Sequence, residues 1–202
     1  MSLYDLIFEG GGAKGSVFVG ALTAFYEKGH QPRRLIGTSA GAITATLLAA
    51  GFTPNEMKEA VNETLKGKPR FASFMDKPKA EDFSQELIDH SDIMGFLKKI
   101  DVPFIPEVLE EKFESLLMKA LMALPPYRQV FCFAECGGLF AGDLFLAWLK
   151  EKIASKGFDP EITLKKFHEH PNVKNELSLV ASDTSEGGGI LILNHRTAPG
   201  CP

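Results

Sequence analysis

One serine, Ser39, lies between two glycines in the sequence Gly-Thr-Ser-Ala-Gly at residues 37–41. The segment before it, 32–36, ends in two large apolar residues and is typical of a short strand, whereas the small and apolar run 42–50 after it is typical of a buried helix. A Gly-x-Ser-x-Gly sequence at a strand-to-helix turn is the pattern of a nucleophile elbow, which presents the serine hydroxyl at the end of the strand. The pattern therefore predicts nucleophilic catalysis by Ser39.

A second glycine motif, Gly-x-Gly-x-x-Gly, occupies residues 10–15 between an expected strand at 3–8 and an expected helix at 16–28. Backbone N–H groups at the start of a helix have no partner within that helix, and glycines let an anion approach them closely. Acyl transfer needs such donors, aimed at the oxyanion that forms when a serine attacks a carbonyl. On neighbouring strands, the two motifs together predict an oxyanion hole beside Ser39. Its candidate positions are Gly10, Gly11, Gly12 and Gly15.

The same upstream motif is also the fingerprint of dinucleotide-binding folds. That function requires an acidic residue about 20 positions further on, at the end of the next strand, where this chain has Gly37, Thr38 and Ser39. A phosphate-binding P-loop does not fit either, because Lys14 precedes Gly15 instead of following it. A nucleotide-binding α/β protein is therefore the least favoured alternative. A structural role also stays open, in which the glycines form a tight turn and the serine caps the next helix.

Activation of a serine hydroxyl requires a base, usually a histidine that a carboxylate holds in place. None of the five histidines follows an expected strand end with a glycine-rich turn. Only two strands are expected up to the serine motif, which is fewer than the order of an ordinary α/β-hydrolase would place there. The sequence therefore does not predict a Ser-His-Asp triad.

These features together resemble the patatin-like phospholipase domain. The resemblance rests on the two glycine motifs at 10–15 and 37–41, on the Phe-Glu-Gly approach at 8–10 and on the position of Lys14. It implies an α/β protein with the three-layer α/β/α patatin-like fold, a mainly parallel central sheet and a largely helical insertion at about 53–156. We therefore expect residues 1–202 to form a single patatin-like domain.

The resemblance also implies an activity and its residues. The expected enzyme is a serine carboxylic-ester hydrolase of lipid degradation, a phospholipase or esterase, which forms an acyl intermediate on Ser39 and uses a Ser–Asp dyad. Gly11 and Gly12 would be the main oxyanion donors, and Lys14 would add positive potential near a lipid phosphate. The substrate would be a phospholipid or other acyl lipid, with transient contact to a membrane surface. No cofactor or metal is expected.

The dyad aspartate is the part of the family's pattern that the sequence lacks. The family has it in Asp-Gly-Gly or Asp-Gly-Ala, and no aspartate of this chain is followed by glycine. We therefore expect the chain to be truncated, with the aspartate beyond Pro202 and little activity in residues 1–202 alone. Asp183, which follows an expected strand at 177–181, is the alternative base, although it also suits a plain turn. A non-catalytic acyl-lipid-binding module of the same fold is the alternative function.

The bulk composition fits a globular protein of about one domain, with 202 residues, 45% hydrophobic and 24% charged. The net charge of −4 gives no reason to expect a nucleic-acid partner. The N-terminus has no basic segment before an apolar run, and no apolar stretch reaches the ~20 residues of a membrane helix. The expected location is therefore cytoplasmic or unknown, with no signal peptide and no transmembrane segment.

The remaining elements follow from periodicity and from turn residues. A mobile loop is expected at 67–79, and residues 177–181 and 190–193 are expected to be a hairpin or neighbouring strands. The apolar residues of 106–124 form one stripe, for which core packing is favoured and a lid helix over an acyl pocket is the alternative. The helices are expected at 53–65, 84–99, 106–124 and 144–155.

Overall fold

A computed structural model describes residues 2–12, 16–99, 107–183 and 188–196, without the side chains of 107–111. The chain divides into two compact units. The first unit contains residues 1–72 and 145–202, and the second contains residues 73–144. Each unit is described by itself below.

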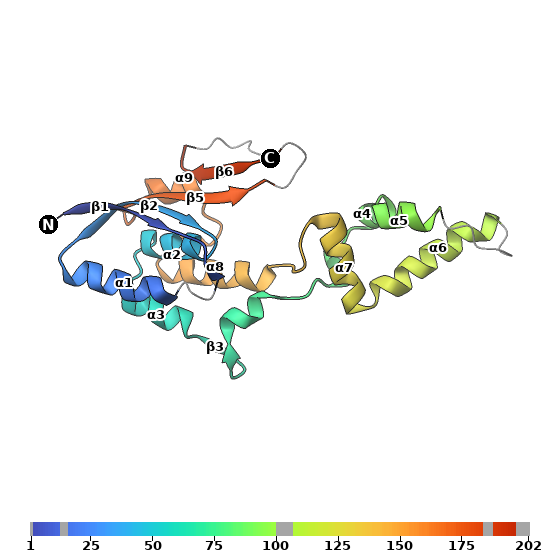
Figure 1. Ribbon diagram of the computed structural model, residues 1–202, viewed down its shortest axis with the longest axis horizontal. Coiled ribbons are helices and arrows are strands. Elements are labelled where there is room, and N and C mark those ends of the chain that lie inside the picture. Colours follow the sequence, from blue (N-terminus) through green and yellow to red (C-terminus); the bar gives the residue numbers. More distant parts are fainter. Residues whose placement is uncertain (1, 13–15, 100–106, 184–187, 197–202) are drawn as a thin grey trace. The chain divides into compact units, whose positions relative to one another are not determined.

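The first unit is built on a four-stranded sheet with the strand order β1-β2-β5-β6 (Figure 1). β1 (Leu3–Phe8) is parallel to β2 (Gln31–Thr38), and β2 is parallel to β5 (Glu176–Ser182). β6 (Ile190–Asn194) is antiparallel to β5, so that these two strands form the expected hairpin. The predicted α/β class with a mainly parallel sheet is confirmed.

Helices cover one face of this sheet. Phe18 of α1 packs edge to face on Phe8 of β1, and α2 packs against β1, β2 and β5. Leu149 of α8 and Phe167 of α9 line a common pocket with Leu177 of β5, which places both helices on that same face. The helices of this unit are α1 (Ser16–Glu27), α2 (Ala40–Ala49), α3 (Pro54–Val61), α8 (Asp143–Ser155) and α9 (Leu164–Glu169).

The opposite face of the sheet carries exposed apolar side chains. Ile7 of β1 is 75% exposed and Ile190 of β6 is 78% exposed, with Leu3 and Ile192 also exposed. Within the ranges that the structure describes, helices therefore form a layer on one side of the sheet. The second helical layer of an α/β/α arrangement is not among these residues.

Residues 64–69 form a small hairpin where a helix end and a mobile loop were expected. The helix predicted at 53–65 ends at Val61, and β3 (Thr64–Leu65) then pairs with β4 (Lys68–Pro69). The two residues between these strands both have positive φ, 51° at Lys66 and 76° at Gly67, which is the backbone of a tight hairpin turn. A 3-10 helix at Arg70–Phe74 follows, so the predicted loop at 67–79 is partly regular structure.

The second unit is helical. The helix expected at 84–99 is two helices, α4 (Gln85–Asp89) and α5 (Asp92–Leu97), because the Ser91 hydroxyl accepts a hydrogen bond from the Met94 N–H and donates one to the Ile88 carbonyl. α7 (Pro125–Cys136), which was not predicted from the sequence, starts with two prolines and ends at Gly137 with φ 71°. The core of this unit contains Phe83, Met94, Met118, Met122, Phe131 and Cys132.

The stripe predicted on the long helix α6 (Glu107–Met122) only partly faces this core. Met118 and Met122, which lie outside the predicted stripe, are buried in it, whereas the stripe residues Phe113 and Leu116 are 41% and 66% exposed. Core packing is therefore wrong for the Phe113 side of the stripe. The helix has one apolar side in the core and a second apolar side at the surface.

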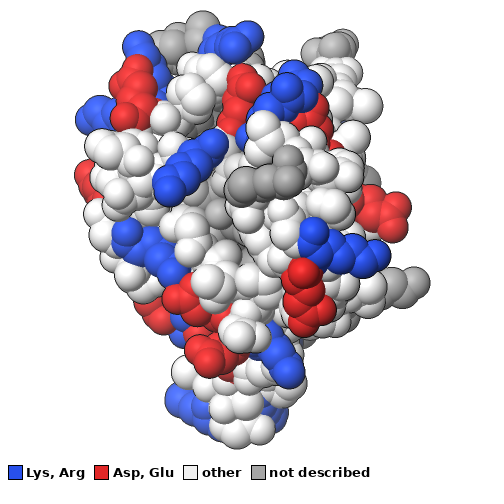
Figure 2. All heavy atoms as spheres, turned by 90° about the vertical axis from the view of Figure 1, so that its left-hand side faces the viewer, with Lys and Arg blue, Asp and Glu red and all other residues white. Residues whose placement is uncertain are grey.

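Charged side chains do not gather by sign on the face drawn in Figure 2. Lysine and arginine alternate there with aspartate and glutamate around uncharged surface. No helix in the described part of the chain is long and apolar enough to cross a bilayer.

Candidate active site

Ser39 lies at the turn between β2 and α2, where the sequence predicts it. β2 ends at Thr38 and α2 begins at Ala40, so Ser39 occupies the N-cap position. Its backbone has φ 53° and ψ −124°, a conformation that residues other than glycine rarely adopt and that is typical of strained functional sites. The side chain is exposed and makes no capping hydrogen bond to the helix. Helix capping therefore does not explain this serine.

The glycines on either side of Ser39 are required by close backbone packing. A Cβ atom at Gly37 would come within 2.6 Å of the Ala42 Cα atom, and one at Gly41 would come within 2.6 Å of the Glu9 carbonyl oxygen. Real Cβ atoms do not approach backbone atoms so closely. The start of α2 is thus packed directly against the end of β1, and this contact brings the two glycine motifs together.

The glycine-rich loop begins beside the serine. A Cβ atom at Gly10 would lie 3.2 Å from the Ser39 Cβ and 3.9 Å from its Oγ. Gly11 and Gly12 follow at the surface, and Gly12 has a φ of 55°. The predicted neighbourhood of Ser39 and this loop is therefore present. Lys14 and Gly15, for which a phosphate contact and an oxyanion role were predicted, lie outside the described residues.

An apolar cavity of about 270 Å³ opens next to the elbow. Gly12 from the loop and Ala40 from the start of α2 both line it. The Thr44 hydroxyl on its wall donates to the Ala40 carbonyl, so this polar group is satisfied within the helix. The cavity is lined by Gly12, Ser16, Val19, Ala40, Ile43, Thr44, Leu47, Met57, Val61, Asn62, Phe71 and Trp148.

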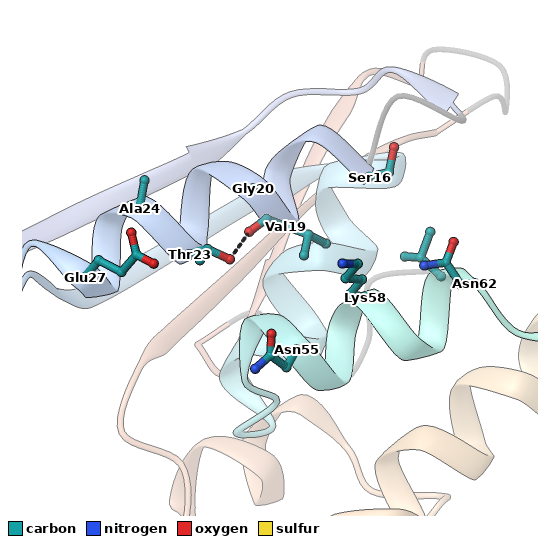
Figure 3. A pocket seen from close by; sticks show the side chains of 10 residues that line it. Ser16, Val19, Gly20, Thr23, Ala24, Glu27, Asn55, Lys58 and Asn62 are labelled. Atoms are coloured by element: carbon teal, nitrogen blue, oxygen red, sulfur yellow. Dashed lines mark hydrogen bonds between the residues drawn. The ribbon is translucent and has the colours of Figure 1, made fainter.

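A second, more open groove of about 480 Å³ runs between α1 and α3 (Figure 3). It shares Ser16, Val19, Val61 and Asn62 with the cavity, so the two spaces adjoin. The rest of the groove is lined by Gly20 and Ala24 together with polar side chains. These include Thr23, Glu27, Asn55 and Lys58.

Trp148 is fully buried in the cavity wall and is held by an ionic network. Its Nε1–H donates to Glu63 Oε2 at 3.1 Å, and Arg70 donates to the same oxygen at 3.0 Å. Lys152 pairs with the other oxygen of Glu63. Arg70 also binds Glu151, and this hydrogen bond lowers the pKa of the Glu151 carboxyl and raises the pKa of the arginine. The buried position of Trp148 on its helix could be predicted from the sequence, whereas the cavity could not.

Asp183, the alternative base, follows β5 at the same sheet edge as Ser39, because β2 and β5 are parallel. Its N–H donates to the Gly189 carbonyl at 2.8 Å, which closes the loop between β5 and β6. Gly188 packs against it so closely that a Cβ there would lie 2.9 Å from the Asp183 carboxyl carbon. Asp183 therefore lies at the sheet edge that carries Ser39, with its backbone N–H bonded to Gly189 and its carboxyl group against Gly188.

Two histidines of the first unit, His168 and His195, lie together away from Ser39. The rings of His168 and His195 stack at 3.7 Å, and His195 lies 3.9 Å from Glu176. Glu176 begins β5, so this cluster is at the amino end of the strands, whereas Ser39 is at the carboxyl end. His168 and His195 therefore lie at the opposite end of the strands from Ser39.

Comparisons with known proteins give a family match and several distant relatives. Residues 6–192 match the family model described as patatin-like phospholipase. The uncharacterized protein YqhO of Bacillus subtilis (strain 168) is 26% identical over 188 residues, which are 93% of this chain and 46% of that protein. The chain thus spans about half the length of this curated relative.

Two bacterial proteins of known structure are also similar to this chain. The type III effector protein ExoU is 21% identical with a TM-score of 0.45, and the match covers 98% of this chain and 36% of that one. ExoU belongs to the type III secretion system of Pseudomonas aeruginosa. VipD from Legionella pneumophila is 20% identical with a TM-score of 0.46, over 98% of this chain and 40% of that one. Because the family model matches nearly the whole length of the chain, the chain belongs to the patatin-like phospholipase family.

Proposed function

We propose that the protein is a lipid acyl hydrolase in which Ser39 is the nucleophile. The observation that carries this proposal is the strained elbow of Ser39 with the glycine-rich loop directly beside it. Membership of the patatin-like phospholipase family supports the lipid substrate. The proposed reaction is hydrolysis of a carboxylic ester in a phospholipid or another acyl lipid.

The proposed reaction has two halves. The Ser39 Oγ attacks the ester carbonyl while a carboxylate takes its proton, and the tetrahedral oxyanion accepts hydrogen bonds from N–H groups of Gly10, Gly11 or Gly12. The leaving alcohol takes up the proton as the C–O bond breaks, and the acyl group stays on Ser39. Water then attacks this acyl ester and releases the fatty acid. The N-terminus of α2 behind Ser39 adds positive potential at the developing negative charge.

We propose that the base of a Ser–Asp dyad comes from sequence outside residues 1–202. No aspartate within them has the following glycine of the family's pattern, and the B. subtilis relative is about twice as long as the part that matches. Asp183 is the alternative, because it follows the neighbouring strand at the same sheet edge. Its backbone bond to Gly189 and its close packing against Gly188 favour a structural role.

The cavity beside Ser39 supports an acyl substrate. Its wall is mostly apolar, and it adjoins the elbow at Ala40. Its volume of about 270 Å³ is just below the ~300–1,000 Å³ of pockets for drug-sized ligands, so it suits one acyl chain.

Contact with a membrane surface is proposed for the exposed side of α6 in the second unit. Phe113 and Leu116 lie one turn apart on this side, and Lys112 and Lys119 flank them. Lys98, Lys112 and Lys119 also line one surface groove with Leu116, which the carboxylates Asp89 and Glu114 share. Apolar side chains bordered by lysines suit a surface of anionic lipid, because the apolar groups enter the interface while the ammonium groups reach the phosphates.

The test of the proposed function is the Ser39→Ala variant of the native polypeptide, assayed on a short-chain ester and on phospholipid. We expect the rate to fall by at least about 10³-fold while the fold is kept. Asp183→Asn distinguishes the two candidate bases: we expect it to keep the wild-type rate, whereas a loss as large as that of Ser39→Ala would make Asp183 the base. A Ser39→Ala variant that still hydrolyses ester would overturn the proposal. Lipid binding without hydrolysis in the wild-type protein would favour the non-catalytic module.

A further inference from the structure

We propose that the groove between α1 and α3 binds the headgroup of the lipid substrate, and that it prefers a phosphate that carries a polyol, such as glycerol or inositol. The proposal rests on the proposed function, because that function places the ester carbonyl at Ser39 and the acyl chain in the adjoining apolar cavity. It adds a headgroup site on two helices that carry neither Ser39 nor the glycine-rich loop.

The groove starts where the cavity beside the elbow ends. Gly12 of the glycine-rich loop lines the cavity, and Ser16, the first residue of α1, lines both the cavity and the groove. Asn62, which follows α3, is also shared by the two spaces. A lipid whose acyl chain occupies the cavity can therefore extend its polar part past Ser16 and Asn62 into the groove.

The groove is long enough for a headgroup. Figure 3 shows Ser16 at one end and Glu27 at the other, with Lys58 and Asn55 of α3 between them. The distance from Ser16 to Glu27 is about 16 Å along the helix axis, at 1.5 Å per residue. The α1 side is open in its middle, since a Cβ atom at Gly20 would meet no other atom within 4 Å. The volume of about 480 Å³ lies within the ~300–1,000 Å³ of ligand pockets.

A lysine without an ion-pair partner lies between the two ends of the groove. Lys58 is the only cation among the described residues that line it, and no described carboxylate forms an ion pair with it. Its ammonium group can therefore bind a phosphate as a point charge. An acyl chain in this place would instead cover the ammonium group and the nearby amides, which is unfavourable. The groove thus suits an anionic headgroup better than a second apolar chain.

The other polar groups of the groove suit hydroxyl groups of a ligand. The Thr23 hydroxyl donates to the Val19 carbonyl at 2.9 Å, so toward a ligand it can only accept. The Glu27 carboxylate also accepts, whereas the amides of Asn55 and Asn62 both donate and accept. A polyol supplies donors and acceptors at once, and this is what the set requires.

Two common headgroups without hydroxyls fit the groove less well. Choline has no N–H to donate and is usually bound by aromatic faces, and none of the described residues that line the groove is aromatic. Ethanolamine joins its ammonium group to the phosphate by a short ethylene link, so the ammonium group would lie close to Lys58 when the phosphate is bound there. Glu27, which could pair with it, lies at the end of the groove away from Ser16.

The experiment measures the binding of single-chain lipids to the native polypeptide with Ser39→Ala, which cannot turn over. Octanoyl lysophosphatidylglycerol and octanoyl lysophosphatidylethanol have the same acyl chain and the same charge, and they differ in the hydroxyls of the headgroup. Calorimetric titration with the monomeric lipids should show about tenfold tighter binding of the glycerol lipid. Equal affinities, or tighter binding of octanoyl lysophosphatidylethanolamine, overturn the proposal.

Variants of the groove test where the headgroup binds. Lys58→Gln should weaken the binding of both anionic lipids by about three- to fivefold, because both carry the phosphate. Asn55→Ala with Asn62→Ala should abolish the preference for the glycerol lipid, and so should Gly20→Leu, which fills the groove. Lys28→Gln is the matched control, because Lys28 directly follows α1 and does not line the groove. If Lys28→Gln weakens binding as much as Lys58→Gln, the proposal is overturned.

Failure of this inference can be told apart from failure of the proposed function. Because the titrations need no turnover, equal affinities of the two lipids with intact Ser39-dependent hydrolysis overturn this inference alone. Ester hydrolysis that persists in the Ser39→Ala protein overturns the proposed function instead. The comparison of the two lipids needs no substitution in the groove, so it decides the question even where a groove variant fails to fold.

Discussion

At the scale of single residues, the site depends on positions where no side chain fits. Gly37 and Gly41 pack against backbone atoms, and the contact of Gly41 with the end of β1 places the glycine-rich loop beside Ser39. Ser39 itself holds a φ of 53° without the help of a capping hydrogen bond. The surrounding packing must therefore impose this conformation.

The glycines give a prediction for stability. Gly41→Ala should destabilise the protein by more than the ~1–3 kcal/mol of ordinary overpacking, because the obstacle is backbone and cannot rotate away. Gly20→Ala is the matched control in the exposed middle of α1, where a Cβ would have no neighbour within 4 Å. It should stabilise by about 0.5–1 kcal/mol. Urea denaturation measures both variants, and a Gly41→Ala protein as stable as wild type would contradict the packing described.

The positions of Ser39 and Gly10 could be predicted from the sequence because each motif directly follows a strand. In a parallel pair, both strand ends meet at one edge of the sheet, so the two motifs must be neighbours. The environment of Trp148 could not be predicted in this way. Its bond to Glu63 joins residues 85 positions apart, and no local pattern marks such a contact.

At the scale of elements, α3 forms one wall of the cavity and depends on its first turn. The Thr53 hydroxyl accepts from the Glu56 N–H, and the Glu56 carboxylate accepts from the Thr53 N–H. Glu56 also pairs with Lys156 at 2.7 Å. The hydrogen bond from Lys156, followed by those from Thr53, lowers the pKa of Glu56 to about 2.

The Thr53→Ala variant removes the capping interaction of this helix. We expect the free energy of unfolding to fall by about 1 kcal/mol, which is the usual effect of losing a threonine cap. Urea denaturation at neutral pH measures the change. No loss of stability would mean that the capping box does not form in solution.

The lowered pKa of Glu56 gives a prediction for pH. A carboxyl group with a lower pKa in the folded state stabilises the fold above its unfolded value of 4.5, and this contribution is lost as pH falls from 4.5 toward about 2. Glu56→Gln should therefore make stability less dependent on pH in that window. Glu59→Gln removes the same charge from the same helix but leaves the capping box intact, and should not have this effect. Equal pH profiles for both variants would contradict the assignment.

Element boundaries were predictable where the capping residues lie next to a periodic segment. Thr53 and Pro54 mark the start of α3 in the sequence, and the structure confirms that start. The end of α3 was not predictable from the sequence. The helix stops because the following residues form the β3–β4 hairpin, and the turn of this hairpin at Lys66 and Gly67 is stable only when the two strands pair. The break at Ser91 has the same origin, since a serine caps a helix only when the chain before it bends away.

At the scale of the whole molecule, both units expose apolar side chains. The sheet of the first unit leaves Ile7 and Ile190 uncovered, and α6 of the second unit leaves Phe113 and Leu116 uncovered. The sequence patterns of both segments predict buried faces and cannot say which side is left open. Which apolar face is covered depends on packing between elements distant in the sequence.

Binding to lipid vesicles tests the proposed role of α6. The protein should bind phosphatidylglycerol vesicles more tightly than phosphatidylcholine vesicles, and added salt should weaken this preference. The double variant Phe113→Ser with Leu116→Ser should weaken binding to both kinds of vesicle. The double variant Lys112→Gln with Lys119→Gln should mainly reduce the preference for phosphatidylglycerol, with affinity for those vesicles falling about fivefold per lysine. Phe133→Ser is the control, because Phe133 of α7 is 60% exposed in the same unit. An equal effect of Phe133→Ser would contradict a contact through α6.

The most direct test of the account is covalent labelling of the native polypeptide with a fluorophosphonate, which reacts with activated serines. Peptide mass spectrometry should locate a single adduct on Ser39, and a saturating concentration of a hydrolysable ester should slow its formation. The Ser39→Ala protein should remain unlabelled. An adduct on another serine, or ester hydrolysis by a protein that fluorophosphonate leaves unmodified, would contradict the claim that Ser39 is the nucleophile.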